Sequence, residues 1–319
     1  MLNRMRLSGA KELAERNTIY LSVPNGGRIK QPKVLQLKHH LIMKKASSLL
    51  LLLFVLITTN AQSKISITNK IVNENGEAIE YATIGIPSKK IGTLSDTNGV
   101  FTLNVEIEIS DTLVIRHVSY QEKQIPITEC LNTTNNIVMQ TKQLDEMVVY
   151  NGKRKKALLA NKGMNIAGGE TMLTIAHKGF EVGSMVETKR IFELQEISFN
   201  VRSNNILGAK FSVNIYRQNE ATGEFTNTLC KPIYFDIPVN SDKQEVKIEV
   251  TENVIIQPGT YFVSIMFVDY DNSNIENEQH NSIYFPLYLK SSYTRKGIMN
   301  ELESIPINMG LSLKGIEYR

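Results

Sequence analysis

The feature that most constrains the fold is a series of short runs in which apolar and polar residues alternate, each closed by turn-forming residues. In this chain of 319 residues the period of two recurs from residue 64 onward, and no amphipathic helical pattern accompanies it. Asn75-Gly76 and Asn98-Gly99 are typical of tight turns, in which glycine supplies a positive φ. The pattern therefore predicts an all-β protein.

The first group of runs falls within residues 62–143 and has the density of a small β-sandwich. Several short strands separated by turn signals within roughly 80 residues are typical of that architecture. The expected strand material lies at 65–71, 81–86, 100–105, 113–120, 125–127 and 137–139. No helix is expected in this part of the chain.

Three blocks of this region carry a family resemblance. They are Gly76–Ile84, Gly92–Phe101, and Asp111–Ile115 together with Val118-Ser119-Tyr120. In this order and spacing they resemble the carboxypeptidase-regulatory-like domain, a transthyretin-like (prealbumin-like) sandwich common in exported proteins of Bacteroidetes. The resemblance covers residues 64–141 at most. Because each block is a turn with its flanking strand, the resemblance implies a fold and not a chemistry.

The resemblance does not imply peptidase activity. In zinc carboxypeptidases this sandwich is an accessory to a separate catalytic domain, whose zinc is held by a His-x-x-Glu pair and a distant His. The histidines after residue 61 are His117, His177 and His280, and none has Glu three positions later. We therefore expect a non-enzymatic protein with no catalytic residue, no cofactor and no metal site, and specifically no metallocarboxypeptidase activity.

Two local patterns have a simple structural interpretation. Asp96-x-Asn98-Gly99 begins like a calcium-binding loop but lacks the later bidentate Glu, so it predicts a hairpin turn supported by the Asp96 side chain. His117 alternates with apolar neighbours, and we expect it to be a solvent-facing or hydrogen-bonded strand residue.

Cys130 and Cys230 are the two cysteines, and the sequence does not decide whether they pair.

The second group of runs falls within residues 180–319. Ile197, Phe199 and Val201 alternate after a slip at Leu194 that suggests a bulge. The run 211–217 alternates without interruption, and the mostly apolar run 261–268 predicts a central strand covered on both faces. These runs predict a larger antiparallel β-sandwich of jelly-roll type.

One loop of the second region is a candidate ligand site. Asp269, Tyr270, Asp271 and Asn272 combine carboxylate, amide and aromatic groups. Such a loop could hold calcium or sugar hydroxyls, and it could equally be an ordinary polar surface loop.

Residues 144–179 are expected to join the two sandwiches as a linker. Gln143–Tyr150 resembles the segment between the same sandwich and the plug in TonB-dependent outer-membrane receptors, where it pairs as an added strand with an energy-transducing partner. It could equally be the last strand of the first sandwich. The basic cluster Lys153–Lys156 is interpreted as a solvated linker face, with acidic lipid or polysaccharide contact as the alternative.

Residues 43–61 have the layout of a secretory signal peptide. A basic start at Lys44-Lys45 precedes nine apolar residues, Leu49–Ile57, against the about 20 needed to span a bilayer. Cleavage is expected between Ala61 and Gln62, leaving no transmembrane segment. Residues 1–42 would then be either an over-extended start or a disordered leader.

Removal of the signal changes the net charge. Residues 1–61 hold 10 of the 36 Lys and Arg residues but only 2 of the 32 Asp and Glu residues. The remainder therefore holds 26 basic and 30 acidic residues and carries a net charge of −4. This balance argues against nucleic-acid binding.

The sequence thus predicts an exported, non-enzymatic protein of two β-sandwiches that acts as a binding or structural module. It would work in the periplasm, at the outer-membrane periphery, at the cell surface or outside the cell, on a protein or polysaccharide partner. Two alternatives stay open. One is an exported hydrolase with its site on the second sandwich, and the other is an accessory to a TonB-dependent outer-membrane system.

Overall fold

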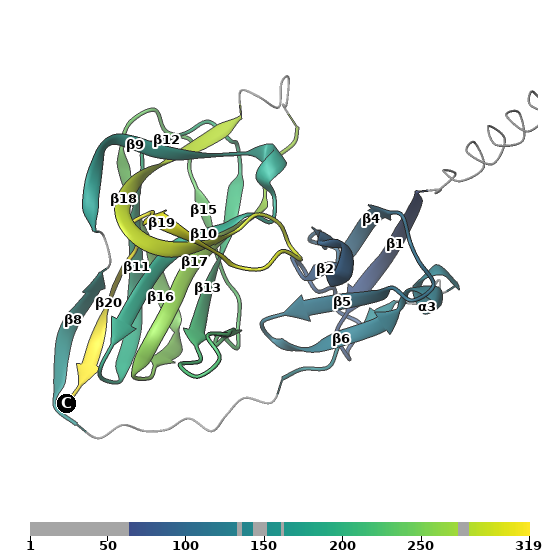
Figure 1. Ribbon diagram of the computed structural model, residues 1–319, viewed down its shortest axis with the longest axis horizontal. Helices are drawn as coiled ribbons and strands as arrows, with labels where there is room; N and C mark the ends of the chain where they lie inside the picture. The colour runs from purple at the N-terminus through teal and green to yellow at the C-terminus, as the bar shows by residue number, and fades with distance from the viewer. Residues whose placement is uncertain (1–63, 133–135, 143–151, 161–162, 274–280) are drawn as a thin grey trace, which may run out of the picture. The chain divides into compact units, whose positions relative to one another are not determined.

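A computed structural model describes residues 64–132, 136–142, 152–160, 163–273 and 281–319 (Figure 1). The expected leader 1–42, the expected signal peptide 43–61, the cleavage site expected between Ala61 and Gln62, and the segment Gln143–Tyr150 all lie outside these residues. Residues Ser63–Arg319 form one compact unit. Within the described ranges, no helix is both long and apolar enough to cross a membrane.

The first part of the described chain is a small β-sandwich, as predicted. One sheet has the order β4-β1-β7 and the other β3-β2-β5-β6. The strands are β1 (Ile65–Val72), β2 (Thr83–Ile86), β3 (Ile91–Leu94), β4 (Val100–Val105), β5 (Thr112–His117), β6 (Tyr120–Pro126) and β7 (Ile137–Val138). Alternate residues of β4, beginning with Phe101, point into the core between the sheets.

The turn at Asp96–Gly99 forms as its sequence predicts. Asp96 Oδ1 accepts hydrogen bonds from the backbone N–H groups of Asn98 at 2.9 Å and Val100 at 2.8 Å. Gly99 has φ of 76°, and a Cβ there would clash with the backbone of Ile71. The Asp96 carboxylate is therefore used to hold the turn.

The expectation of no helix in this sandwich was wrong. Residues Ile127–Asn132 form the short helix α3, and Pro87–Lys89 form a 3-10 turn, η1. Ile127 and Cys130 lie three residues apart on one face of α3 and are both buried in the core. Six residues contain too few turns for a helical period to stand out from neighbouring strands.

The second part of the chain is a larger antiparallel β-sandwich. One sheet has the order β16-β11-β20-β8, and the other has the path β12-β18-β10-β17-β13-β14 with β9, β15 and β19 paired at its sides. The strands are β8 (Arg154–Ala160), β9 (Met164–Thr174), β10 (Glu181–Thr188), β11 (Phe192–Val201), β12 (Ser203–Asn204), β13 (Ala209–Gln218), β14 (Phe225–Asn227), β15 (Ile233–Ile237), β16 (Gln244–Ile256), β17 (Gly259–Asp269), β18 (Ser282–Arg295), β19 (Glu303–Asn308) and β20 (Ser312–Tyr318).

The strands of this sandwich pair in a nested order. The pairs are β8 with β20, β9 with β18, β10 with β17, β11 with β16, and β13 with β15. Successive pairs rolled into two facing sheets are the arrangement of a jelly roll, so the predicted fold class is confirmed. The slip in β11 is a register shift between Leu194 and Glu196, as expected.

The expected linker over 144–179 was wrong for most of its length. Strands β8 and β9 occupy 154–160 and 164–174 and pair with β20 and β18 of the second sandwich. In β8 only Ala157 and Leu159 pack against the core, while the apolar side chain of Leu158 between them is exposed, so the strand shows no alternation of apolar and polar residues. Its basic residues Arg154, Lys155 and Lys156 are exposed, and such a short pattern does not stand out in sequence.

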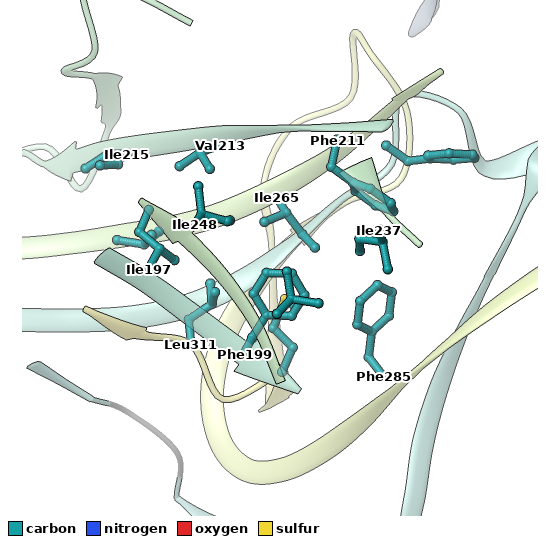
Figure 2. Packing of buried hydrophobic residues seen from close by; sticks show 14 of the residues in the cluster. Ile197, Phe199, Phe211, Val213, Ile215, Ile237, Ile248, Ile265, Phe285 and Leu311 are labelled. Carbon is teal, nitrogen blue, oxygen red and sulfur yellow. The ribbon is translucent and has the colours of Figure 1, made fainter. Parts of the chain in front are cut away.

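The core of the second sandwich is filled from both sheets. Phe211, Val213 and Ile265 come from one sheet, and Ile197 and Ile248 come from the other (Figure 2). Residues 261–268 of β17 are all buried, which confirms the predicted central strand. Strand β18 is curved (Figure 1). Its register shifts against β9 between Pro286 and Tyr288 and against β19 between Leu289 and Ser292.

Candidate functional site

The candidate site is built on the outer face of the sheet β18-β10-β17-β13, the face turned away from the core. On β13 the alternation sends Val213 and Ile215 into the core, so that Ser212, Asn214 and Tyr216 point outward. An outer face is ordinarily solvated, yet these three side chains are all buried. This face of the sheet therefore carries polar groups that are shielded from water.

At the centre of the outer face lies Glu181 of β10, whose side chain is wholly buried. Ser264 Oγ–H donates to Glu181 Oε1 at 2.6 Å, and Asn214 Nδ2–H donates to the same oxygen at 2.8 Å. Tyr216 O–H donates to Oε2 at 3.3 Å, and Arg295 Nε lies 3.4 Å from Oε2. The carboxylate is thus held by three hydroxyl or amide donors and one guanidinium.

The Glu181–Arg295 pair is a cross-strand pair, because the two residues are directly opposite in register. Burial works against the charge of Arg295, but the nearby Glu181 carboxylate and Tyr216 outweigh it and raise the pKa of the guanidinium. Burial and the same carboxylate raise the pKa of Tyr216. Removing either charge would leave the other without an opposite charge to offset its cost of desolvation, so the two charges stabilise the fold only as a pair.

Aromatic rings continue the outer face beside this pair. Phe225 and Tyr293 are half-buried, with ring centroids 4.8 Å apart in an edge-to-face arrangement, over the fully buried Phe262. Tyr216 stacks on Phe262 at 6.0 Å, and the Arg295 guanidinium lies 5.5 Å from the Tyr216 ring centre. Ring faces therefore lie next to the buried polar network.

A cavity of about 880 Å³, here called the outer-face cavity, lies over these residues. From the second sandwich it is lined by Ser212, Asn214, Tyr216, Phe225, Tyr293 and Arg295, among others. Residues of the first sandwich, including Arg116, His117, Tyr120, Glu122 and Lys142, complete the lining. Its size is within the range of small-molecule binding sites.

Two buried polar atoms at the floor of the cavity lack a hydrogen-bond partner among the described protein atoms. Ser212 Oγ and Arg295 Nε are buried without a hydrogen-bond partner among the described protein atoms, although Arg295 keeps its ion pair. Most buried polar groups in folded proteins have such a partner.

His117 of β5 is a hydrogen-bonded strand residue, which is one of the two environments predicted for it. Its Nδ1 accepts a hydrogen bond from the backbone N–H of Ser119 at 3.2 Å, and its Nε2 lies 3.5 Å from Tyr234 Oη. Burial, and to a smaller extent the Lys142 ammonium, lowers the pKa of His117 to about 4. The imidazole is therefore neutral at pH 7.

The low pKa of His117 predicts a loss of stability in mild acid. Below its usual pKa of about 6.5 the unfolded chain binds a proton that the folded chain refuses until about pH 4. The free energy of unfolding should therefore fall as the pH drops through this window, by about 3 kcal/mol in full. Denaturant unfolding at pH 7, 5.5 and 4.5 measures this loss.

The matched variant is His117→Asn, whose side-chain oxygen can still accept from Ser119. This variant should lose that part of the pH dependence while remaining folded at pH 7. Equal slopes of unfolding free energy against pH in the variant and the parent would contradict the assignment to His117.

The loop predicted as a candidate ligand site lies elsewhere and uses its side chains internally. Asp269 accepts from Lys178 Nζ at 2.9 Å and from Tyr81 O–H at 3.1 Å. Asp271 accepts from the backbone N–H of Ser273 at 2.9 Å, and the Tyr270 ring stacks on Phe267. The role of this loop in binding stays a prediction.

The other chemically reactive residues are dispersed. His177 Nδ1 accepts from the backbone N–H of Thr174 within its own turn, and His280 lies outside the described residues. Cys130 is buried, Cys230 is exposed, and both are free thiols. Across the described ranges, no three His, Cys, Asp or Glu side chains gather in a way that could hold a metal ion.

Sequence reasoning did not identify Glu181, Arg295 or the outer face as a site. The alternation of Ser212, Asn214 and Tyr216 with apolar neighbours is the same pattern that a solvated face produces. One usable signal is Gly183, two residues after Glu181. A Cβ at Gly183 would clash with the backbone of Val263 and Ser264, which marks a place where strands approach closely.

The solved structures that resemble this chain include two of low sequence identity. The VP2 subviral particle of infectious bursal disease virus is 10% identical, with 80% of this chain and 65% of that chain covered and a TM-score of 0.28. A structure described as the basis for promiscuous specificity of carbohydrate-binding modules from the β-sandwich superfamily is 9% identical, with 76% and 97% covered and a TM-score of 0.17. With TM-scores this low, neither assigns a fold or a ligand to this chain.

Comparison with protein families identifies the first sandwich. No curated protein matches the chain. Residues 67–149 match the family model described as the CarboxypepD_reg-like domain. The resemblance carried by Gly76–Ile84, Gly92–Phe101 and Asp111–Tyr120 is thereby confirmed, and the first sandwich of this chain is a carboxypeptidase-regulatory-like domain.

Proposed function

We propose that this chain is an exported, non-enzymatic binding protein of the cell envelope that binds a saccharide in the outer-face cavity. The observation that carries the proposal is the lining of the cavity, where half-buried aromatic rings adjoin a polar network on a rigid sheet. Aromatic rings can stack against the C–H faces of sugar rings, and fixed polar side chains can share hydrogen bonds with hydroxyl groups.

The two guanidinium groups that line the cavity favour a neutral ligand. Arg295 is matched by Glu181, and Arg116 Nε lies 2.6 Å from Glu122 Oε2. Because these guanidinium groups already have carboxylate partners, an added anion would have to compete with them. A hydroxyl-rich neutral ligand would meet ring faces and hydrogen-bonding groups without disturbing either pair.

The same contacts support a binding role over a hydrolytic one. Glu181 is wholly buried beneath the cavity floor and is already bonded to Ser264, Asn214 and Tyr216, so it is poorly placed to act as a nucleophile or base. His117 has a pKa of about 4, well below that of a general base poised for neutral pH. Export to the envelope is supported by the signal-like layout of residues 43–61.

The proposal is tested by titrating the chain from Gln62 onward with neutral oligosaccharides in a calorimeter. Cello-, xylo- and chitohexaose serve as probes, and one of them should bind and remain uncleaved after prolonged incubation. Tyr293→Ala should weaken that binding by about tenfold, since an aromatic contact contributes about 0.5–1.5 kcal/mol beyond its buried area.

The matched control is Tyr284→Ala. Tyr284 is also a half-buried tyrosine of β18, but it does not line the cavity. Its replacement should leave the affinity unchanged. Release of shorter sugars would replace the binding proposal by the hydrolase alternative, and absence of binding to all three probes would reject a saccharide ligand.

A further inference from the structure

The aromatic residues of the outer-face cavity form two separate groups. The first group, the Phe225 group, consists of Tyr216, Phe225 and Tyr293 over Phe262. The second, the Tyr234 group, consists of Tyr81, Tyr120 and Tyr234 with His117. In it the rings of Tyr81 and Tyr234 lie 5.1 Å apart, and those of His117 and Tyr120 lie 5.2 Å apart. Residues of both groups line the same cavity.

Strand β13 sets the distance between the groups. Tyr216 belongs to the Phe225 group, while Ser212 lies directly opposite Tyr234 in the register of β13 and β15. Ser212 and Tyr216 are four residues apart on one face of the strand, which corresponds to roughly 13 Å. A single small ring cannot stack at both ends of this distance.

The strand between the groups is polar. Asn214 lies midway between Ser212 and Tyr216 on the same face, with Asn227 Nδ2–H donating to its Oδ1 at 2.9 Å. Ser212 itself is buried with an unpartnered hydroxyl among the described protein atoms. Polar side chains flanked by aromatic groups are suited to an elongated molecule whose ends are stacked and whose middle is hydrogen-bonded.

We propose that the outer-face cavity is a two-subsite track along β13 for an extended oligosaccharide, with one sugar unit at the Phe225 group and another at the Tyr234 group. This inference rests on the proposed saccharide-binding function and adds the length and orientation of the ligand. Occupation of two linked subsites makes the second contact intramolecular, so affinity should rise sharply once a chain reaches both.

The experiment is a chain-length series with the chain from Gln62 onward. Calorimetric titration uses the mono- to hexasaccharides of the cello, xylo and chito series. Within the series that binds, Kd should fall by at least about 100-fold at the length that bridges the two groups, and then level off.

Two variants assign the subsites. Tyr293→Ala removes a ring of the Phe225 group, and Tyr120→Ala removes a half-buried ring of the Tyr234 group on the first sandwich. Each variant should weaken binding of the hexasaccharide by about tenfold or more and reduce the dependence of Kd on chain length. Tyr284→Ala should do neither. Circular dichroism and thermal melting confirm that each variant is folded.

The outcomes separate the two proposals. Binding whose affinity is the same for a disaccharide and a hexasaccharide overturns the track and keeps the saccharide site. Loss of binding in Tyr293→Ala with no effect of Tyr120→Ala also overturns it, because only one subsite would then be used. Failure of every length in all three series rejects the proposed function itself.

Discussion

Replacing Arg295 by Ala is expected to lower the free energy of unfolding by about 3–5 kcal/mol, because it leaves the wholly buried Glu181 carboxylate without a compensating charge. Ser264, Asn214 and Tyr216 would still donate hydrogen bonds, but none of them carries a positive charge. Chemical denaturation at pH 7 with two spectroscopic probes measures the change.

Two comparisons make this expectation specific. Lys296→Ala removes the neighbouring ion pair with Glu303, whose side chains are about half exposed, and should cost less than about 1 kcal/mol. Removing both buried charges in Glu181→Gln with Arg295→Met should recover much of the lost stability, since apolar or neutral replacement of a buried pair is often tolerated. A double variant as unstable as Arg295→Ala would show that the charge of Glu181 is not the cause.

The second large effect is expected at Phe211, which joins the aromatic residues of the second core. Its ring is fully buried and lies 5.1 Å from Phe267 and 5.8 Å from Phe235. Phe211→Ala should lower the free energy of unfolding by about 3–5 kcal/mol, because a close-packed core cannot collapse around the cavity left behind.

The control for Phe211 is Leu289→Ala on the exposed surface of β18. Leu289 is about half exposed, so its removal should change the unfolding free energy by no more than about 0.5 kcal/mol. A loss of less than about 1 kcal/mol in Phe211→Ala would mean that the two sheets are not packed on each other as described.

The fold class was predictable because alternation reports which face of a strand is buried. The alternating run 211–217 and the continuous apolar run 261–268 both supply residues to the core of the second sandwich and stand out in sequence. Strand β8 did not stand out, because at the sheet edge only Ala157 and Leu159 face the core. Helix α3 was missed since only Ile127 and Cys130 are buried among its residues 127–131.

The candidate site was not predictable for a different physical reason. The alternation of apolar and polar residues shows that the side chains of Asn214 and Tyr216 point away from the core. It does not show whether other residues cover them. Glu181 and Arg295 are more than a hundred residues apart and meet only because β10 and β18 are neighbours in the folded sheet. The polar loop at Asp269 stood out in composition, yet Lys178 and Tyr81 engage its first carboxylate.

The nested strand order has a consequence for how the second sandwich can be made. Strand β8 needs β20 as its neighbour, and β20 also separates β8 from β11, so this four-stranded sheet stays incomplete until residue 318 has left the ribosome. Pairing β8 with β20 closes a loop that contains most of the second sandwich. Such a closure slows folding, because the chain loses conformational entropy before the contacts between the strands form. Until β20 is available, β8 and β11 each lack a hydrogen-bonded neighbour on one side, and such unpaired strand edges expose a nascent chain to premature association with other chains.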